Sequence, residues 1–154
     1  MSVILPGATI GILGGGQLGR MTAMAARAMG YDVHVLDPDP HCSAAAVASR
    51  VVAARFDDAD AAVELARGCD VITLEIEQVA VTALEAAARH APVRPGAAAI
   101  WIVQDRVRQK DWLAEHAFPV GPFRHAESEA DVAGAVQAMG PSIVKAAHGG
   151  YDGR

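Results

Sequence analysis

The sequence predicts an α/β protein whose Rossmann-like parallel sheet is followed by the incomplete start of a second domain. The first supporting observation is an apolar run at 8–13, followed by a glycine-rich turn and a segment without a helix breaker until Gly30. Further apolar segments then alternate with helical segments of about a dozen residues, which is typical of βαβ units. Short polar motifs also follow three of the predicted strands directly, as expected for ligand sites at the carboxyl ends of parallel strands.

The glycine-rich turn allows three interpretations. Gly14, Gly16 and Gly19 fit the G-x-G-x-x-G spacing, in which the glycines permit a tight turn and a close approach of ligand to backbone. The predicted helix at 17–29 would then offer its N-terminus to an anion. The turn could bind a dinucleotide, bind another phosphate-bearing substrate, or serve only packing.

Asp37 bears on the dinucleotide interpretation. It ends the second predicted strand, about 20 residues beyond the turn, where an acidic residue would bind a ribose hydroxyl. The motif Asp37-Pro38-Asp39-Pro40 nevertheless suits a dinucleotide poorly, because neighbouring carboxylates repel phosphate.

The remaining elements follow in order from apolar patterning and helix signals. We expect strands at 32–36, 50–54 and 70–74, and helices at 43–49, 57–68 and 79–90. Ser43 could cap the first of these helices, and Asp57 and Asp58 begin the second.

The alternation of predicted strands and helices ends after residue 91. Pro92-Val93-Arg94-Pro95-Gly96 predicts turns, and helices are expected at 97–103, 105–116 and 127–139, with an extended linker at 118–122. A strand at 141–146 and a second glycine-rich loop at 148–154 complete the chain. The pattern predicts domains at 1–95 and 123–154, joined by a helical connection and linker at 96–122.

The last predicted strand has no partner after it. Since a lone strand would leave an unpaired edge, we expect the chain to be a fragment of a longer protein.

Composition excludes several classes of protein. Hydrophobic residues make up 52% of the 154, which supports a packed core, and the net charge of −5 disfavours a nucleic-acid binder. No apolar run is long enough to span a membrane, and no signal peptide is evident. With only Cys42 and Cys69, the sequence predicts reduced thiols in a cytoplasmic protein.

Glu75 and Glu77 follow the strand at 70–74 directly. If the strand alternation continues, both carboxylates point to one side and Ile76 to the other. Such a pair could bind an amine or hydroxyls of a substrate. It could also be a solvated strand end before a helix, whose N-terminus favours acidic residues.

Lys145 lies in the apolar segment 143–145, where a buried ammonium would need a partner. A nucleotide phosphate is one such partner, and the glycine loop that follows could cradle phosphates through its N–H groups. The alternative is an edge-strand lysine whose ammonium reaches water. Arg106 and Lys110 could simply form a solvated helix face, and the histidines show no metal-ligand spacing.

Taken together, the motifs resemble the 5-(carboxyamino)imidazole ribonucleotide synthase family of ATP-grasp enzymes. The resemblance rests on six motifs in the same order along nearly the whole chain: Gly14 to Met21, Leu36 to Pro40, Glu75 to Val79, Gln104 to Lys110, Lys145, and Gly149 to Arg154. It implies a pre-ATP-grasp domain followed by the truncated start of an ATP-grasp domain.

The resemblance also implies a reaction. ATP would phosphorylate bicarbonate, and the exocyclic amine of 5-aminoimidazole ribonucleotide would take up the carboxyl group, leaving ADP and phosphate. The family's substrate contacts correspond to Gly15, Gly16, Gln17, Leu18, Glu75 or Glu77, Tyr151 and Arg154. Its ATP contacts correspond to Arg106, Lys145, Gly150, Tyr151, Asp152, Gly153 and Arg154.

The family's members are longer and are commonly dimers. The part beyond residue 154 should carry the Mg²⁺ ligands, so we expect no metal site in this chain and no activity from it alone. No residue here is assigned as a catalytic acid or base.

Three alternatives stay open at the level of sequence. A related ATP-grasp enzyme, such as the formate-dependent glycinamide ribonucleotide transformylase, has a similar first turn and acidic segment. An NAD-dependent dehydrogenase would use the first turn and Asp37 but would leave Lys145 and the last loop unexplained. A non-catalytic Rossmann-like module would bind none of these nucleotides.

Overall fold

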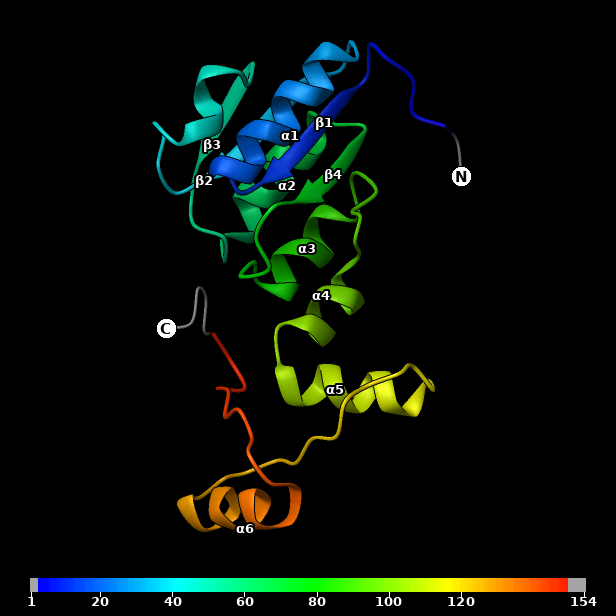
Figure 1. The fold of residues 1–154 in the computed structure, drawn as a ribbon. Helices are drawn as coiled ribbons and strands as arrows, with labels where there is room; N and C mark the ends of the chain where they lie inside the picture. The colour runs from blue at the N-terminus through cyan, green and yellow to red at the C-terminus, as the bar shows by residue number, and fades with distance from the viewer. Residues whose placement is uncertain (1–2, 150–154) are drawn as a thin grey trace. The chain divides into compact units, whose positions relative to one another are not determined.

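A computed structural model of the chain describes residues 3–149. The chain divides into two compact units, Met1–Ile100 and Trp101–Arg154. The first contains a four-stranded parallel sheet with the strand order β3-β2-β1-β4 (Figure 1). The strands are β1 (Thr9–Leu13), β2 (Asp32–Asp37), β3 (Arg50–Ala53) and β4 (Val71–Leu74). The predicted parallel α/β sheet is therefore confirmed.

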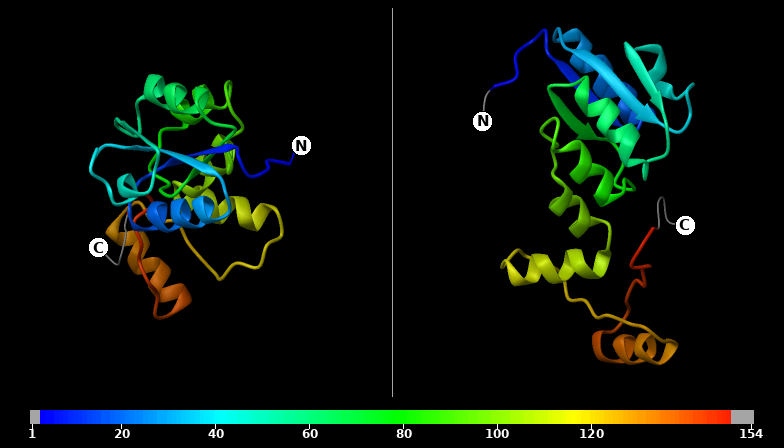
Figure 2. Two further views of the ribbon diagram at one scale, coloured as in Figure 1. Left: turned by 90° about the horizontal axis from the view of Figure 1, so that it is seen from above. Right: turned by 180° about the vertical axis from the view of Figure 1, so that it is seen from behind.

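The helices of the first unit cover both faces of the sheet. They are α1 (Gln17–Ala28), the short 3₁₀ helix η1 (Ser43–Ala46), α2 (Ala59–Arg67) and α3 (Val81–Ala87). Helix α1 lies on one face and α2 on the other, which is clearest in the view from above (Figure 2, left).

Alternation along the strands produces two hydrophobic clusters, one for each face. On one face Ile12, Val33 and Val35 pack with Ala23 and Ala26 of α1. On the other face the largest buried side chains include Leu13, Leu36, Leu65, Ile72 and Leu84. Full burial of one such side chain contributes roughly 1.5–3 kcal/mol, so these clusters hold the sheet and its helices together.

Local signals explain the element boundaries. Helix α1 ends before Gly30, which has a φ of 89° and therefore favours glycine. Helix α2 begins after Asp58, whose side chain accepts a hydrogen bond from Ala61 N at 2.9 Å. The predicted helix at 43–49 is shorter than expected, and Cys42 rather than Ser43 precedes its first turn.

The connection at 92–96 also pairs with strand β4. Ile72 N donates to Pro92 O, and Arg94 N donates to Ile72 O, both at 2.8 Å. This parallel bridge between Ile72 and Val93 extends the sheet beyond β4.

The remaining helices are α4 (Ala97–Val103), α5 (Arg106–Glu115) and α6 (Glu129–Met139). Asp105 caps α5 and Ser128 caps α6, as their positions before the predicted helices suggest.

The predicted strand at 141–146 is wrong. No described segment pairs with it, and Ile143 and Val144 are 84% and 67% exposed. A strand requires a partner for its backbone hydrogen bonds, and apolar composition alone does not supply one. Among the described residues, no helix is both long and apolar enough to cross a bilayer.

Candidate functional site at the carboxyl edge of the sheet

Three polar segments meet where the strands of the sheet end. The glycine turn follows β1, Asp37 ends β2, and Glu75 follows β4. Because β1 lies between β2 and β4 in a parallel sheet, these segments are neighbours at one edge. The structure thus confirms that the glycine turn, the segment beginning at Asp37 and the segment beginning at Glu75 share one rim of the sheet.

Backbone hydrogen bonds fix the glycine turn between its neighbours. Gly14 N donates to Leu36 O at 2.9 Å, and Glu75 N donates to Leu13 O at 2.9 Å. Gly14 has a φ of 103°, a conformation in which a side chain would be strained. The turn is therefore held in one shape by the strands on both sides.

The side chain of Glu75 lies against this turn. A Cβ atom at Gly14 would fall 2.5 Å from Glu75 Oε2, and one at Gly16 would lie 3.4 Å from both carboxylate oxygens. Within residues 3–149 the carboxylate of Glu75 has no hydrogen bond or ion pair. A half-buried carboxylate in this position can accept hydrogen bonds from an amine or hydroxyl of a ligand.

Glu77 differs from Glu75. Strand β4 ends at Leu74, so the alternation that would have aligned the two carboxylates does not continue through this segment. Glu77 is exposed, whereas Glu75 is partly buried at the turn. The expectation that both carboxylates point to one side assumed a strand that reaches Glu77, and β4 ends three residues before it.

Gly19 brings helix α1 onto the turn. A Cβ atom there would lie 2.3 Å from Gly14 O, which is backbone and cannot move aside. Helix α1 begins after Gly16, which offers no side-chain cap, and its first turn carries no acidic residue. Its first N–H groups therefore leave partial positive charge near Gln17 and Leu18.

Asp37 supports the turn from the other side. Its Oδ2 accepts a hydrogen bond from Gly15 N at 2.7 Å, and its Oδ1 accepts one from Asp39 N at 2.9 Å. In the dinucleotide interpretation this carboxylate would bind ribose hydroxyls, and the backbone N–H of the turn would face phosphate. Here the two groups bind each other, which disfavours a dinucleotide.

Cys42 is a neighbour of the turn that the sequence did not suggest. A Cβ atom at Gly15 would lie 2.3 Å from Cys42 Sγ, so the thiol packs directly against this glycine. Burial, and then the charge of Asp37, raise the pKa of Cys42 above its usual value. The thiol is thus a neutral packing group. Cys42 and Cys69 are both unpaired, in agreement with the prediction of free thiols.

In the second unit, Arg106 lies close to the segment that follows Lys145. Arg106 N donates to Ala147 O at 2.8 Å, and His148 Nε2 lies 3.2 Å from Asp105 Oδ2. Hydrogen bonds from the backbone N–H groups of Arg108 and Val107 lower the pKa of Asp105, so this residue is a carboxylate at neutral pH.

Lys145 is exposed, contrary to the burial that its apolar neighbours suggested. The other predicted ATP contacts, Gly150, Tyr151, Asp152, Gly153 and Arg154, lie outside the described residues. No group of three or more potential metal ligands occurs within the described part of the chain. The described residues therefore do not fit a Mg²⁺ site.

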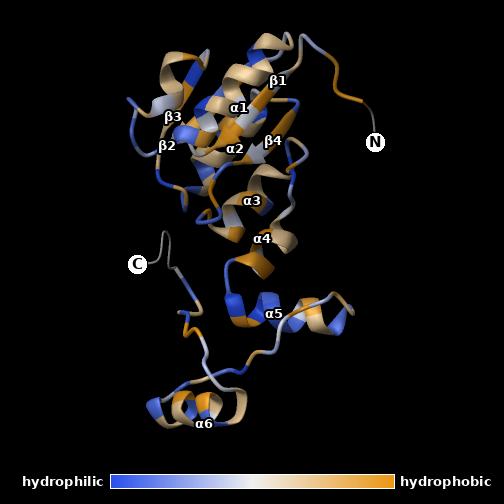
Figure 3. Cartoon of the chain, in the orientation of Figure 1, coloured by the Kyte–Doolittle hydropathy of each residue, from blue (hydrophilic) through white to orange (hydrophobic). Residues whose placement is uncertain are grey.

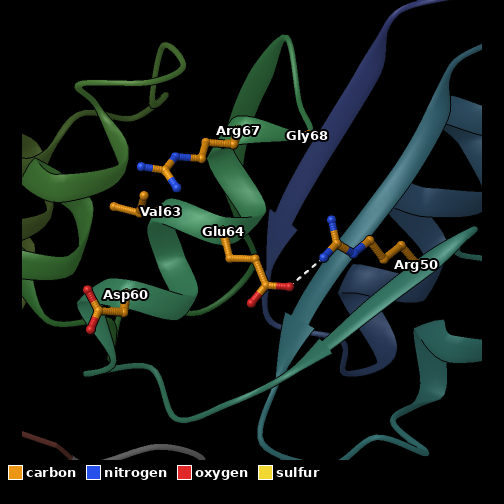
Figure 4. Close-up of a pocket in the computed structure, with 6 residues that line it drawn as sticks. All are labelled: Arg50, Asp60, Val63, Glu64, Arg67 and Gly68. Carbon is orange, nitrogen blue, oxygen red and sulfur yellow. Dashed lines mark hydrogen bonds and ion pairs between the residues drawn. The ribbon is translucent and has the colours of Figure 1, made fainter.

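A separate hollow of about 530 Å³ lies between α2 and β3 (Figure 4). Its lining includes Arg67 and Gly68 at the end of α2, and an ion pair joins Arg50 to Glu64. Arg50 is the first residue of β3, so the hollow lies at the amino edge of the sheet, away from the glycine turn. Its two arginines are accompanied by Asp60 and Glu64, so it carries no excess of positive charge.

Comparison with known proteins identifies the family. The family model described as "Ribonucleotide synthetase preATP-grasp domain" matches residues 7–104. The chain belongs to this family. The residues matched include the whole sheet, both hydrophobic clusters and the rim that holds Glu75.

The relatives of this preATP-grasp domain extend the similarity into the second unit. The chain is 46% identical over 150 residues to an N5-carboxyaminoimidazole ribonucleotide synthase of Brucella melitensis, covering 97% of this chain and 41% of the relative. The structure of N5-carboxyaminoimidazole synthetase from Staphylococcus aureus with ADP matches with a TM-score of 0.90 and 41% identity, over 98% of this chain and 41% of that one.

A fungal structure is also similar. It is N5-carboxyaminoimidazole synthase from Aspergillus clavatus in complex with ADP and 5-aminoimidazole ribonucleotide, with a TM-score of 0.69 and 31% identity. The match covers 86% of this chain and 36% of that one. The chain thus resembles the N-terminal portion of these enzymes and spans about 40% of their length. The expected resemblance is confirmed.

Proposed function

We propose that the protein containing this chain is an ATP-dependent ligase that carboxylates 5-aminoimidazole ribonucleotide. The reaction consumes bicarbonate and ATP and yields 5-carboxyaminoimidazole ribonucleotide, ADP and phosphate. The observation that carries the proposal is the similarity of nearly the whole chain to N5-carboxyaminoimidazole ribonucleotide synthases. In this proposal the first unit contributes to the ribonucleotide site.

The rim of the sheet supplies chemistry that suits this substrate. The carboxylate of Glu75, which rests on the glycine turn, accepts a hydrogen bond from the exocyclic amine. The turn itself, Gly15, Gly16, Gln17 and Leu18, forms a wall beside the ribonucleotide. Since Asp37 and Glu75 place negative charge on both sides of the turn, we assign amine and hydroxyl binding here, and phosphate binding to cations elsewhere.

The ATP site belongs to the second unit in this proposal. Arg106 and Lys145 bring cations to the phosphates, and Gly150, Tyr151, Asp152, Gly153 and Arg154 form the phosphate-binding loop, with Tyr151 and Arg154 also near the ribonucleotide. The Mg²⁺ ligands come from the part of the protein that this chain does not include. We further propose that the protein acts in the cytoplasm as a homodimer.

The full-length protein tests the proposal. ADP release is measured with ATP and bicarbonate, in the presence and absence of 5-aminoimidazole ribonucleotide. The expected result is release that requires both bicarbonate and the ribonucleotide, with none from the 154-residue chain alone. Release that requires formate and glycinamide ribonucleotide would instead support the related transformylase. Calorimetry with NAD tests the dehydrogenase, for which tight binding of NAD but not of the ribonucleotide would be required.

A further inference from the structure

Two adjacent residues at the start of α5 bind two adjacent residues of the segment at 141–149. Arg106 N donates a hydrogen bond to Ala147 O at 2.8 Å, and His148 Nε2 lies 3.2 Å from Asp105 Oδ2. We call these two contacts the α5 clamp. The partners are distant in the sequence, so the clamp fixes one segment of the chain on another.

The carboxylate of Asp105 is the fixed half of its pair with His148. Its Oδ1 accepts hydrogen bonds from Val107 N at 2.8 Å and Arg108 N at 3.0 Å, which cap the helix. The side chain of Asp105 is 16% exposed, whereas that of His148 is 70% exposed. The helix cap therefore holds the carboxylate, and the imidazole depends on the carboxylate for its position.

The rest of the segment at 141–149 has little else to hold it on α5. Within residues 3–149, none of its other members makes a hydrogen bond or ion pair with this helix. Its apolar residues Ile143 and Val144 are exposed. The first turns of α5 are mostly in the blue of hydrophilic residues (Figure 3), so apolar packing does not replace the clamp. Two polar contacts thus determine where this segment lies on the helix.

We infer that Asp105 and His148 are positioning residues for the phosphates of the nucleotide. The inference rests on the proposed function, in which Arg106 and Lys145 bring cations to those phosphates. Lys145 lies two residues before Ala147, and Arg106 binds Ala147, so the clamp holds both cations on one support. The chain then continues into the predicted phosphate-binding loop. Donors that are fixed before the nucleotide arrives reduce the entropy that binding costs.

The charge of His148 should determine the strength of the clamp. Among residues 3–149, the charged groups joined to this pair are Asp105 itself and Arg108, whose guanidinium lies 3.7 Å from Asp105 Oδ2. A protonated imidazole forms an ion pair with the carboxylate, whereas a neutral one can only donate a hydrogen bond. Arginine keeps its charge throughout the range in which histidine ordinarily titrates, from about pH 5 to about pH 8. The clamp should therefore weaken as pH rises through this range.

Calorimetry of ADP with the full-length protein tests the positioning role. His148→Ala should weaken ADP binding by about threefold near pH 6, an effect typical of an exposed ion pair. His148→Arg keeps a positive charge beside Asp105 and should restore most of the affinity. His125→Ala is the matched control, because His125 Nε2 also lies 3.2 Å from a carboxylate of α5, Asp111 Oδ1, but outside the clamp. Equal ADP affinity in His148→Ala and the unsubstituted protein would overturn the inference.

The pH profile separates a charge effect from a general structural one. The ratio of ADP affinities between the unsubstituted protein and His148→Ala should fall toward one as pH rises from about 6 to about 8.5. The corresponding ratio for His148→Arg should stay constant, since arginine keeps its charge. Ratios are compared because the phosphates of ADP also titrate in this range. A ratio for the unsubstituted protein that did not change with pH would overturn the role of the His148 charge.

Amide hydrogen exchange of the 154-residue chain tests the clamp without a nucleotide. His148→Ala should speed exchange of the Arg106 N–H, which binds Ala147 O, by about threefold. The N–H of Val107, which binds Asp105 within the helix cap, should exchange at an unchanged rate. Unchanged exchange at Arg106 would overturn the clamp. If the unsubstituted full-length protein bound no ADP, the proposed function and the positioning role would fail together, whereas equal affinities with and without His148 would overturn the inference alone.

Discussion

At the residue scale, two carboxylates beside one turn have different roles. Asp37 is bound by the backbone N–H groups of Gly15 and Asp39, so it stabilises the turn. Glu75 rests on the same turn without a hydrogen bond or ion pair among the described residues. The difference follows from their positions. Asp37 ends β2 and its carboxylate binds the backbone of the turn, whereas Glu75 follows β4 and its carboxylate packs beside Gly14 and Gly16 of the turn.

We therefore predict that Glu75→Gln in the full-length protein weakens binding of 5-aminoimidazole ribonucleotide by about tenfold or more. The amide keeps the shape of the carboxylate but loses the charge-assisted hydrogen bond to the amine. Calorimetry measures the ribonucleotide and ADP separately, and ADP affinity should stay unchanged. Glu77→Gln is the control and should have a smaller effect on the ribonucleotide. The assignment of Glu75 would be wrong if Glu77→Gln had the larger effect.

Cys69 provides a prediction about pH. Burial raises its pKa to about 12, and the thiol lies 3.6 Å from His34 Nδ1. A thiol whose pKa is higher in the folded state than in the unfolded state contributes stability that is complete below the unfolded pKa, near 9. That contribution is lost as pH rises from about 9 to about 12. Urea titrations should show that the free energy of unfolding declines over this pH range. The decline should be less steep in Cys69→Ala than in the unsubstituted chain. If stability declined equally steeply with pH in both proteins, the raised pKa of Cys69 would be wrong.

At the scale of elements, the first residues of the helices are the features that the local sequence determines best. Asp58, Asp105 and Ser128 each precede a helix and accept hydrogen bonds from its first N–H groups. These signals are local, so they operate whatever the helix packs against. The strand predicted at 141–146 had no comparable local signal and depended on a partner.

We predict that Asp58→Ala destabilises the first unit by about 1 kcal/mol, because the N–H of Ala61 loses its acceptor. Chemical denaturation monitored by circular dichroism measures the loss. Asp58→Asn should retain most of the stability, since asparagine also caps helices well. Asp60→Ala, in the first turn of the same helix, removes only a charge near the helix dipole and should cost less. Equal losses for Asp58→Ala and Asp60→Ala would rule out the capping role.

At the scale of the whole molecule, the burial of residues differs between the two units. Both hydrophobic clusters consist of residues up to Ile100, and the family model ends at residue 104. Between residues 101 and 149 no residue is buried. The described part of the second unit therefore has few interactions that could make its unfolding cooperative.

We predict that a chain of residues 1–104 folds and unfolds cooperatively, with a free energy of unfolding within about 1 kcal/mol of that of the 154-residue chain. Residues 101–154 alone should show a broad transition of low cooperativity. Urea titrations of the three chains provide the comparison. A large loss of stability in the shorter chain would show that the second unit contributes to the stability of the sheet.

Much of this fold could be inferred from the sequence, because its elements depend on local rules. The first turn requires glycines at Gly14, which has positive φ, and at Gly19, which leaves no room for a side chain, so the motif is visible in the sequence. Alternating strands and helices predict a parallel sheet, and such a sheet brings the ends of its strands to one edge. The shared rim of the glycine turn and the acidic segment was therefore predictable.

Contacts between residues that are far apart in the sequence could not be inferred from such local rules. The hydrogen bond from Gly15 to Asp37, the approach of Glu75 rather than Glu77 to the turn, and the packing of Cys42 all join residues more than 20 positions apart. The bridge from Ile72 to Val93 and the exposure of the segment at 141–146 are of the same kind. Local patterns specify which elements form and where the strands end, whereas the side chains that meet at those ends are selected by packing across the sheet.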